Sequence, residues 1–242
     1  MDLKTYQRDC LLGTLGAVLM LIGDLCLSIR RQRTICQRGI SEWIVGRMAA
    51  AAAAGHTGLS GMALCYFTVK ASCAQIPPQF RKTRMALLIG GVIYIASAGV
   101  VHFFIGSLVD WTGKLAPILG REETVAVIQA QYQRLMPPLL IAYAGMILLI
   151  LTSFFALLMK KTVLPRRMLA WHMLVWQIVF ALIPDIRQLL GAEISTWDFV
   201  LSQGSGNAAL AIWMAANALW AARQRKERGR EINYNVSDKE IG

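Results

Sequence analysis

Six stretches of roughly 20 mostly apolar residues constrain this chain more than any other feature. They lie at residues 11–29, 48–69, 85–108, 135–159, 168–183 and 199–222. A helix of about 20 apolar residues spans the hydrocarbon core of a bilayer, and lipid offers no partners for backbone groups that a helix would leave unpaired. The sequence therefore predicts an all-α fold, in which residues 1–222 form one polytopic bundle of six transmembrane helices.

The composition excludes the common soluble classes. The chain is 56% hydrophobic and 16% charged, whereas soluble proteins carry about 25% charged residues. The five cysteines show no paired spacing, so neither a disulfide framework nor a cysteine metal site is expected. The net charge of +11 comes from residues in short loops and the C-terminal tail, where Lys and Arg set topology and meet anionic head groups. We therefore expect membrane lipids as partners, and no nucleic acid.

The distribution of positive charge predicts the orientation. With the N-terminus inside, 16 of the 25 Lys and Arg residues fall in cytoplasmic segments, which the positive-inside rule favours. We expect both termini in the cytoplasm and a location in the cell (inner) membrane. The tail at 223–242 is basic and then polar, and we expect it to be helical for a turn or two and partly disordered beyond. The first outer loop opposes this orientation because it carries five arginines (Arg30, Arg31, Arg33, Arg38 and Arg47).

Two local patterns refine the predicted bundle. Glu122 and Glu123 open a helical segment that should continue into the fourth span, with a kink at Pro137 and Pro138. Small residues concentrate in the first, second and sixth spans, where they allow close helix contacts. We expect those three spans to lie inside the bundle, and the fourth span, rich in Leu, Ile and Phe, to face lipid.

Polar residues within or next to the spans are the candidate functional groups. An ionisable side chain at bilayer depth costs about 2.5 to 3.5 kcal/mol on insertion scales, so each one requires a reason. A rise of about 1.5 Å per residue places several of them in the outer half of the bundle. We expect Pro184 to break the fifth helix, which would put Asp185 and Arg187 at its outer end, while His172 lies at the cytoplasmic end. The convergent set is Asp24, His56, His102, Tyr143, Asp185, Arg187 and Asn207.

The types of these residues suggest roles. Asp24 or Asp185 would orient His102, which would take or give a proton, so these three are the candidate catalytic residues. His56, Tyr143, Arg187 and Asn207 would bind the substrate. Paired histidine spacings that indicate a metal are absent, as are nucleotide, serine-hydrolase and haem motifs. We therefore expect no metal and no cofactor.

Three short segments resemble parts of known membrane protein families. The string Leu21 to Leu27, with Gly23-Asp24, resembles the Gly-Asp-x-x-Leu element of lysoplasmalogenase-like membrane enzymes, which act on lysolipids. This resemblance implies a catalytic acid at Asp24. The segment Trp213 to Trp220, with Asn217, resembles the end of a span in emopamil-binding, sterol-isomerase-like proteins. The layout from Pro184 to Asn207 resembles uncharacterised multi-pass bacterial proteins, which implies a fold and no activity.

Three functions remain open from the sequence. The first is a polar pocket in the outer half that binds, and can process, a lipid-like or amphiphilic small molecule. The second is a proton-coupled transporter or channel, since intramembrane Asp and His residues relay protons. The third is a structural scaffold in which the polar residues only hold helices together. The oligomeric state is not predicted.

Overall fold

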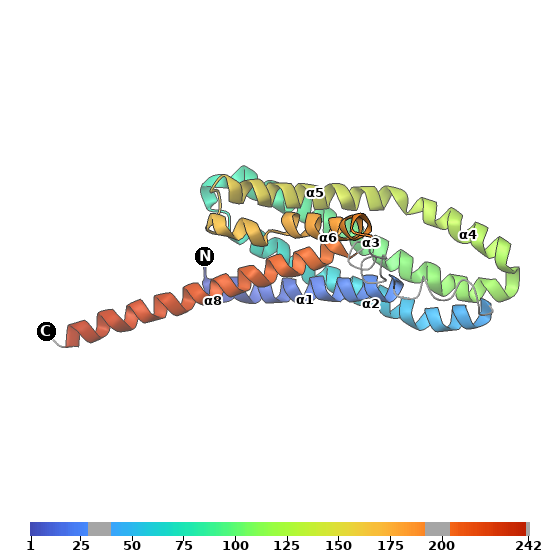
Figure 1. Cartoon of the computed structure of the whole chain (residues 1–242), viewed down its shortest axis with the longest axis horizontal. Helices are drawn as coiled ribbons and strands as arrows, with labels where there is room; N and C mark the ends of the chain where they lie inside the picture. The colour runs from blue at the N-terminus through green and yellow to red at the C-terminus, as the bar shows by residue number, and fades with distance from the viewer. Residues whose placement is uncertain (29–39, 192–203, 241–242) are drawn as a thin grey trace.

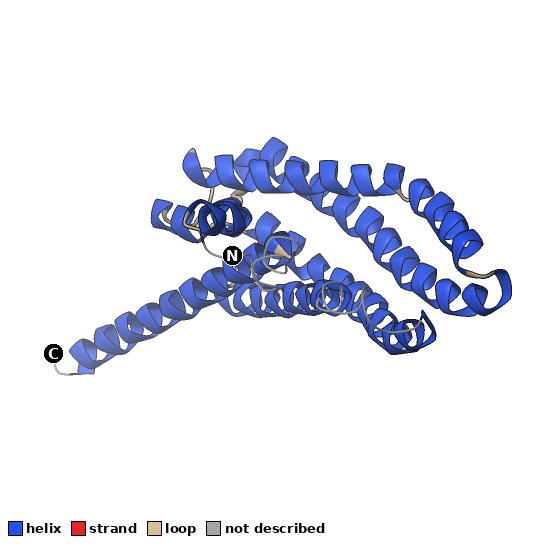
Figure 2. Cartoon of the chain, turned by 45° about the vertical axis from the view of Figure 1, so that its right-hand side comes forward, coloured by secondary structure: helices blue, strands red, loops and turns tan. Residues whose placement is uncertain are grey.

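The computed structural model describes residues 1–28, 40–191 and 204–240, and in these ranges the chain is helical with no strand. The helices lie side by side in an elongated bundle (Figures 1 and 2). In chain order they are α1 (Leu3–Ser28), α2 (Ile40–Ala74), η1 (Pro78–Phe80), α3 (Arg81–Leu119), α4 (Arg121–Arg134), α5 (Met136–Leu158), η2 (Arg166–Trp171), α6 (Met173–Leu189) and α8 (Ser205–Glu240).

Three of the described segments are long and apolar enough to cross a membrane. They are Pro78–Phe104, Met136–Leu158 and Arg166–Leu189. The chain therefore has the helices of a membrane protein. Every expected span overlaps a helix, although residues 29 and 199–203 of the first and sixth spans lie outside the described residues, as do the arginines at 30, 31, 33 and 38.

The third helix is much longer than its apolar stretch. α3 has 39 residues, about 58 Å at the usual helical rise, whereas the hydrocarbon core of a bilayer is about 30 Å thick. It passes Leu108 and ends at Leu119. The next residue, Gly120, caps it with a φ of 78°, in the left-handed region that glycine tolerates. α4 then returns along α3 (Figure 1), so the two helices form a hairpin beyond the end of the apolar stretch.

The segment that opens at Glu122 and Glu123 is helical, but the expectation that it continues unbroken into the fourth span is wrong. α4 ends at Arg134 and α5 begins at Met136, with Pro137 in its first turn. Proline suits this position because the first-turn N–H groups have no intrahelical partner to lose. α5 does not face lipid on all sides. It buries the face that contains Gly145, Leu149 and Ser153.

Glycines bring the helices into contact. A Cβ at Gly16 of α1 would lie 2.9 Å from the carbonyl oxygen of Gly61 on α2, and one at Gly145 of α5 would lie 2.6 Å from the backbone nitrogen of Tyr94 on α3. Backbones at such distances leave no space for a side chain, as in other membrane helix pairs. The expectation that small residues in the first two spans mediate packing is confirmed.

The predicted end of the fifth helix at Pro184 is wrong. α6 begins at Met173 and continues through Pro184 to Leu189, so Asp185 and Arg187 lie within its last turns. A proline removes one backbone hydrogen bond but does not force termination when the flanking turns are otherwise helical. The helix ends at Leu189, and Gly191, two residues further on, has a φ of 71° in the left-handed region.

The last helix extends far past its span. α8 runs without a break from Ser205 to Glu240 and so includes the basic segment after Ala222 (Figure 1). The guanidinium of Arg225 donates a hydrogen bond of 2.7 Å to Gln7, next to the beginning of α1. The ends of α2 and α5 are also joined, because the N–H of Val163 donates a hydrogen bond of 2.9 Å to the carbonyl of Gln75.

These contacts define what we call the basic end of the bundle. α1 and α3 begin there, α2 and α5 end there, and η2 and α6 follow. Its cationic residues are Lys4, Arg8, Lys70, Arg81, Lys82, Arg84, Lys160, Lys161, Arg166, Arg167, Arg223, Arg225 and Lys226.

Candidate functional site

His102 is the candidate residue with the most defined surroundings. It lies on α3, is partly buried, and packs on α2 where that helix has a glycine. A Cβ at Gly58 would lie 2.7 Å from Nδ1 of His102. The imidazole therefore occupies the space that a side chain at Gly58 would need. This contact brings His102 close to the α2 backbone two residues from His56.

The other candidate residues lie on several helices. Tyr143 of α5 is 50% exposed, and Asp185 of α6 is exposed as well. Arg187 of α6 and Asn207 of α8 are partly buried, and each takes part in a polar or electrostatic interaction. Asn207 follows Gly206, which approaches the Gln177 amide of α6. The side chains of Asp24 and His56 lie outside the described part, although their helices are described.

A second set of polar residues, missed as a site by sequence reasoning, is buried near the basic end. The Tyr6 hydroxyl donates a hydrogen bond of 2.8 Å to Oδ1 of Asn217, and Nδ2 of Asn217 donates one of 2.7 Å to the carbonyl of Trp213. Tyr6 and Asn217 are both buried. This chain of bonds joins α1 to α8 and satisfies both ends of the amide.

His172 continues the buried set toward α5. It is the N-cap of α6, and its Nδ1 accepts the N–H of Leu174 at 3.1 Å. Its Nε2 lies 3.0 Å from the hydroxyl of Ser153, which donates to the Ile150 carbonyl. Since Nδ1 accepts, a neutral ring carries its proton on Nε2 and donates to Ser153.

Aromatic rings enclose His172. The Trp213 ring centroid is 4.7 Å away and that of Phe154 is 5.3 Å away. We refer to Tyr6, Ser153, His172, Trp213 and Asn217 together as the buried polar cluster. It joins four helices, α1, α5, α6 and α8, in one half of the bundle.

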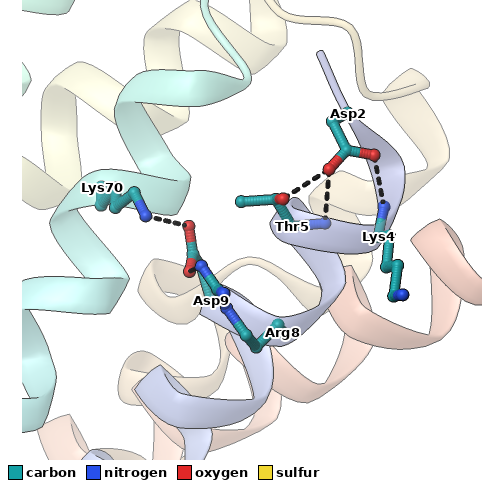
Figure 3. A network of polar contacts seen from close by, with 6 residues as sticks. All are labelled: Asp2, Lys4, Thr5, Arg8, Asp9 and Lys70. Atoms are coloured by element: carbon teal, nitrogen blue, oxygen red, sulfur yellow. Dashed lines mark hydrogen bonds and ion pairs between the residues drawn. The ribbon is translucent and has the colours of Figure 1, made fainter.

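Charged groups lie beside this cluster at the beginning of α1 (Figure 3). The buried carboxylate of Asp9 is 3.0 Å from Nζ of Lys70 on α2 and 3.2 Å from the guanidinium of Arg8. An otherwise unfavourable buried charge is thus paired on two sides.

Asp2 caps the same helix. It accepts the hydroxyl of Thr5 and the N–H groups of Lys4 and Thr5. The Thr5 hydroxyl and these two amides hold the pKa of the Asp2 carboxyl below its usual range.

The chemistry of the two sets differs. The candidate residues include exposed and ionisable groups, and His102 among them contacts Gly58 of α2. The buried polar cluster is closed and mostly bonded internally. Among the side chains that the structure describes, no group of three or more His, Cys, Asp or Glu residues has the arrangement of a metal site.

Comparison with known proteins gives a family and no activity. No curated protein and no solved structure matches the chain. The model of one family, described as a family of unknown function (DUF6796), matches residues 1–215, which include all of the candidate residues and every member of the buried polar cluster except Asn217. The chain therefore belongs to the DUF6796 family of unknown function.

Proposed function

We propose that this is an integral protein of the cell (inner) membrane that binds, and can process, a lipid-like or amphiphilic molecule in the outer half of a six-span bundle. Three sufficiently apolar helices support membrane insertion. The other three spans would be the apolar parts of α1, α2 and α8, which pack alongside them (Figure 1).

The basic end supports an orientation with both termini in the cytoplasm. Lys and Arg residues from the helix ends gather there, and cytoplasmic segments carry an excess of these residues. With that end inside, the α3–α4 hairpin would project outside, and His102 would lie in the outer half.

The packing of His102 on Gly58 is the observation that carries the proposed ligand site. Ionisable residues within spans mark functional pathways and sites more often than lipid-facing surfaces. Because His102 is partly buried, one side of the ring is held by α2 while another remains available to a ligand. Asp24 or Asp185 would act as the carboxylate that orients the imidazole, and His56, Tyr143, Arg187 and Asn207 would contact the polar part of the ligand.

The test is photo-crosslinking with a diazirine-bearing lysolipid, chosen because Gly23-Asp24 resembles lysoplasmalogenase-like enzymes. The full chain is labelled in phosphatidylethanolamine–phosphatidylglycerol nanodiscs, and modified peptides are mapped by mass spectrometry. We expect label on α2 and α3 around His102, and a several-fold loss in His102→Ala. Gly58→Ala should give a similar loss because the added methyl displaces the imidazole.

Ser107→Ala is the matched control, because Ser107 lies between one and two turns further along α3, is partly buried like His102 and donates a hydrogen bond to the Phe103 carbonyl of its own helix. Equal labelling of all variants, with each variant still folded, would reject the ligand site and leave the scaffold function.

A proton-coupled transporter or channel is the second candidate. It gains support from the buried polar cluster, because polar groups then occur in both halves of the bundle. Proton flux into proteoliposomes that depends on His102 and His172, under an imposed gradient, would favour it over simple binding.

A further inference from the structure

Six cationic residues of the basic end follow the ends of α2 and α5. We call them the basic patch, and they are Arg81 and Lys82 at the start of α3, and Lys160, Lys161, Arg166 and Arg167 in the α5–η2 connection and in η2. Five of these six are exposed, and Lys161 is partly buried. The sequence has no Asp or Glu from residue 70 to 109 or from 136 to 184. The segments that carry the patch therefore supply no carboxylate that would neutralise it.

Two contacts join the α3 half of the patch to the α5–η2 half. Nζ of Lys161 lies 6.0 Å from the centre of the Phe80 ring, and Phe80 immediately precedes Arg81. Two residues after Lys161, the N–H of Val163 donates a hydrogen bond of 2.9 Å to the carbonyl of Gln75, just past the end of α2. α3 and α5 are also packed against each other. The positive charges of the two halves therefore adjoin.

The guanidinium of Arg166 is fixed at the end of α5. Its Nε and Nη2 donate hydrogen bonds of 3.2 and 3.0 Å to the carbonyl of Leu158, the last residue of that helix. A guanidinium has more N–H donors than this carbonyl uses, and its planar fork matches the oxygens of a phosphate. Arg166 is exposed, so an anion can reach the other donors. The patch thus contains one cation that is already positioned.

The patch lies where the candidate spans meet the edge of the membrane. Each of the three candidate spans in the described part of the chain has one end there, because Pro78–Phe104 and Arg166–Leu189 begin at the patch and Met136–Leu158 ends at it. Trp171 of η2 is 50% exposed and stacks on Trp176 with the ring centroids 6.2 Å apart. Tryptophan is enriched at the boundary between hydrocarbon and head groups. These features place the basic patch at the depth of the lipid head groups.

An exposed apolar face continues from the patch along α3. Arg81, Met85, Leu88 and Val92 follow the i, i+4, i+7, i+11 spacing of one helix face. The three apolar members are 45%, 44% and 55% exposed. Positive charge that continues into an apolar face complements an amphiphile with an anionic head and apolar chains. A nucleic acid or an acidic peptide has no chains that this face would cover.

We propose that the basic patch binds the head group of an anionic phospholipid. The lipid phosphate lies between Arg81, Lys161 and the positioned guanidinium of Arg166, and an acyl chain lies along the face formed by Met85 and Leu88. The site rests on the membrane insertion proposed above. It does not rest on the ligand site at His102, which lies about 32 Å from Arg81 along α3 at the usual helical rise.

Native mass spectrometry of the full chain in a mild detergent tests this site. The protein is incubated with equal amounts of phosphatidylglycerol and phosphatidylcholine of different acyl length, so that the retained lipids differ in mass. Both lipids carry a phosphate, but only phosphatidylglycerol has a net negative charge. We expect several-fold more phosphatidylglycerol than phosphatidylcholine on the protein. Equal retention of the two lipids would overturn the proposal.

A pair of double variants locates the binding. Arg81→Gln/Lys161→Gln removes two charges from the patch, and retained phosphatidylglycerol should fall several-fold, toward the level of phosphatidylcholine. Lys226→Gln/Arg228→Gln is the matched control, because it removes the same charge from exposed positions of α8 and should retain phosphatidylglycerol as the wild type does. Equal losses in the two variants would show attraction to net charge alone and would overturn the site.

A second patch variant keeps the test sharp if the loss of the Lys161 contact with Phe80 lowers the melting temperature. Arg81→Gln/Lys82→Gln changes two exposed residues and should lose phosphatidylglycerol against the same control. An unchanged retention in this folded variant would also overturn the site.

Competition with inorganic phosphate identifies the source of the bound phosphate. Phosphatidylglycerol should stay bound in millimolar phosphate, because its acyl chains add contacts that the free ion lacks. Full displacement would assign the patch to a soluble phosphate and overturn the lipid proposal. A wild-type chain that retains neither lipid would reject membrane insertion together with this site, whereas equal retention of both lipids rejects this site alone.

Discussion

The hydroxyl of Tyr6 lies 2.8 Å from Oδ1 of Asn217, 211 positions away in the sequence, and the bond is fully buried. This hydrogen bond joins α1 to α8 near the basic end of the bundle. Nearby, the rings of Tyr6 and Trp220 meet edge to face at 6.2 Å. The contact between α1 and α8 is therefore held by specific polar and aromatic geometry in addition to apolar burial.

The first prediction concerns this bond. Tyr6→Phe removes the donor and leaves Oδ1 of Asn217 buried without a partner, which should cost about 1 to 3 kcal/mol of unfolding free energy. Asn217→Leu should also destabilise, but the double variant should lose less than the sum of the two single losses. Equilibrium unfolding in mixed micelles measures the double-mutant cycle. Simple additivity would show that the bond contributes nothing.

The second prediction concerns the contact between α3 and α5. Gly145→Ala would place a methyl group 2.6 Å from the backbone nitrogen of Tyr94, so the helices must separate, at a cost of about 1 to 3 kcal/mol. Gly99→Ala on α3 is the control, because nothing lies within 4 Å of its Cβ position. The control should keep the wild-type melting temperature or exceed it, since alanine favours helix. Equal effects of the two substitutions would contradict this packing.

The third prediction concerns His172. His172→Ala removes the cap of α6 and the partner of Ser153, and should destabilise the protein by about 2 kcal/mol. His172→Asn keeps an N-cap acceptor for Leu174 and should recover part of the loss. Thermal unfolding followed by Trp fluorescence reports on the change, because the Trp213 ring contacts His172. A loss that is the same for both variants would assign the effect to ring packing and exclude the cap.

The fourth prediction concerns pH and the beginning of α1. The pKa of Asp2 is lowered in the folded chain, so its stabilising effect is fully present above its usual value of 3.8 and is lost as the pH falls through the lower folded value. The amides of Lys4 and Thr5 should then lose protection. Hydrogen exchange of the N-terminal peptide at several acidic pH values, compared with Asp2→Ala at each pH, measures this. A constant difference between the two proteins down to strong acid would contradict the cap.

The apolar runs predicted where the helices lie, because burial in lipid depends on local composition. They did not predict where the helices end. α3 continues past Asp110, Lys114 and Pro117, since a helix that leaves the bilayer no longer needs apolar residues. α6 continues past Pro184 because neighbouring turns support it.

The site was harder to anticipate than the fold. Residues such as His102 attract attention because they interrupt apolar runs. Tyr6 and Ser153 do not, and their importance comes from partners on other helices, Asn217 and His172. His172 and Asn217 stand out in the sequence as polar residues within spans, but only tertiary contacts join them through Trp213. Helix order alone does not provide those contacts.

The unbroken course of α8 has a mechanical consequence. One helix includes Trp213 and Asn217 inside the bundle and the segment that extends past Arg225 to Glu240 (Figure 1). A helix is stiff over this length, and no loop separates its two parts to absorb movement. A displacement of the C-terminal part of α8 would therefore be transmitted along the helix to the contacts of Asn217 with Tyr6 and of Trp213 with His172.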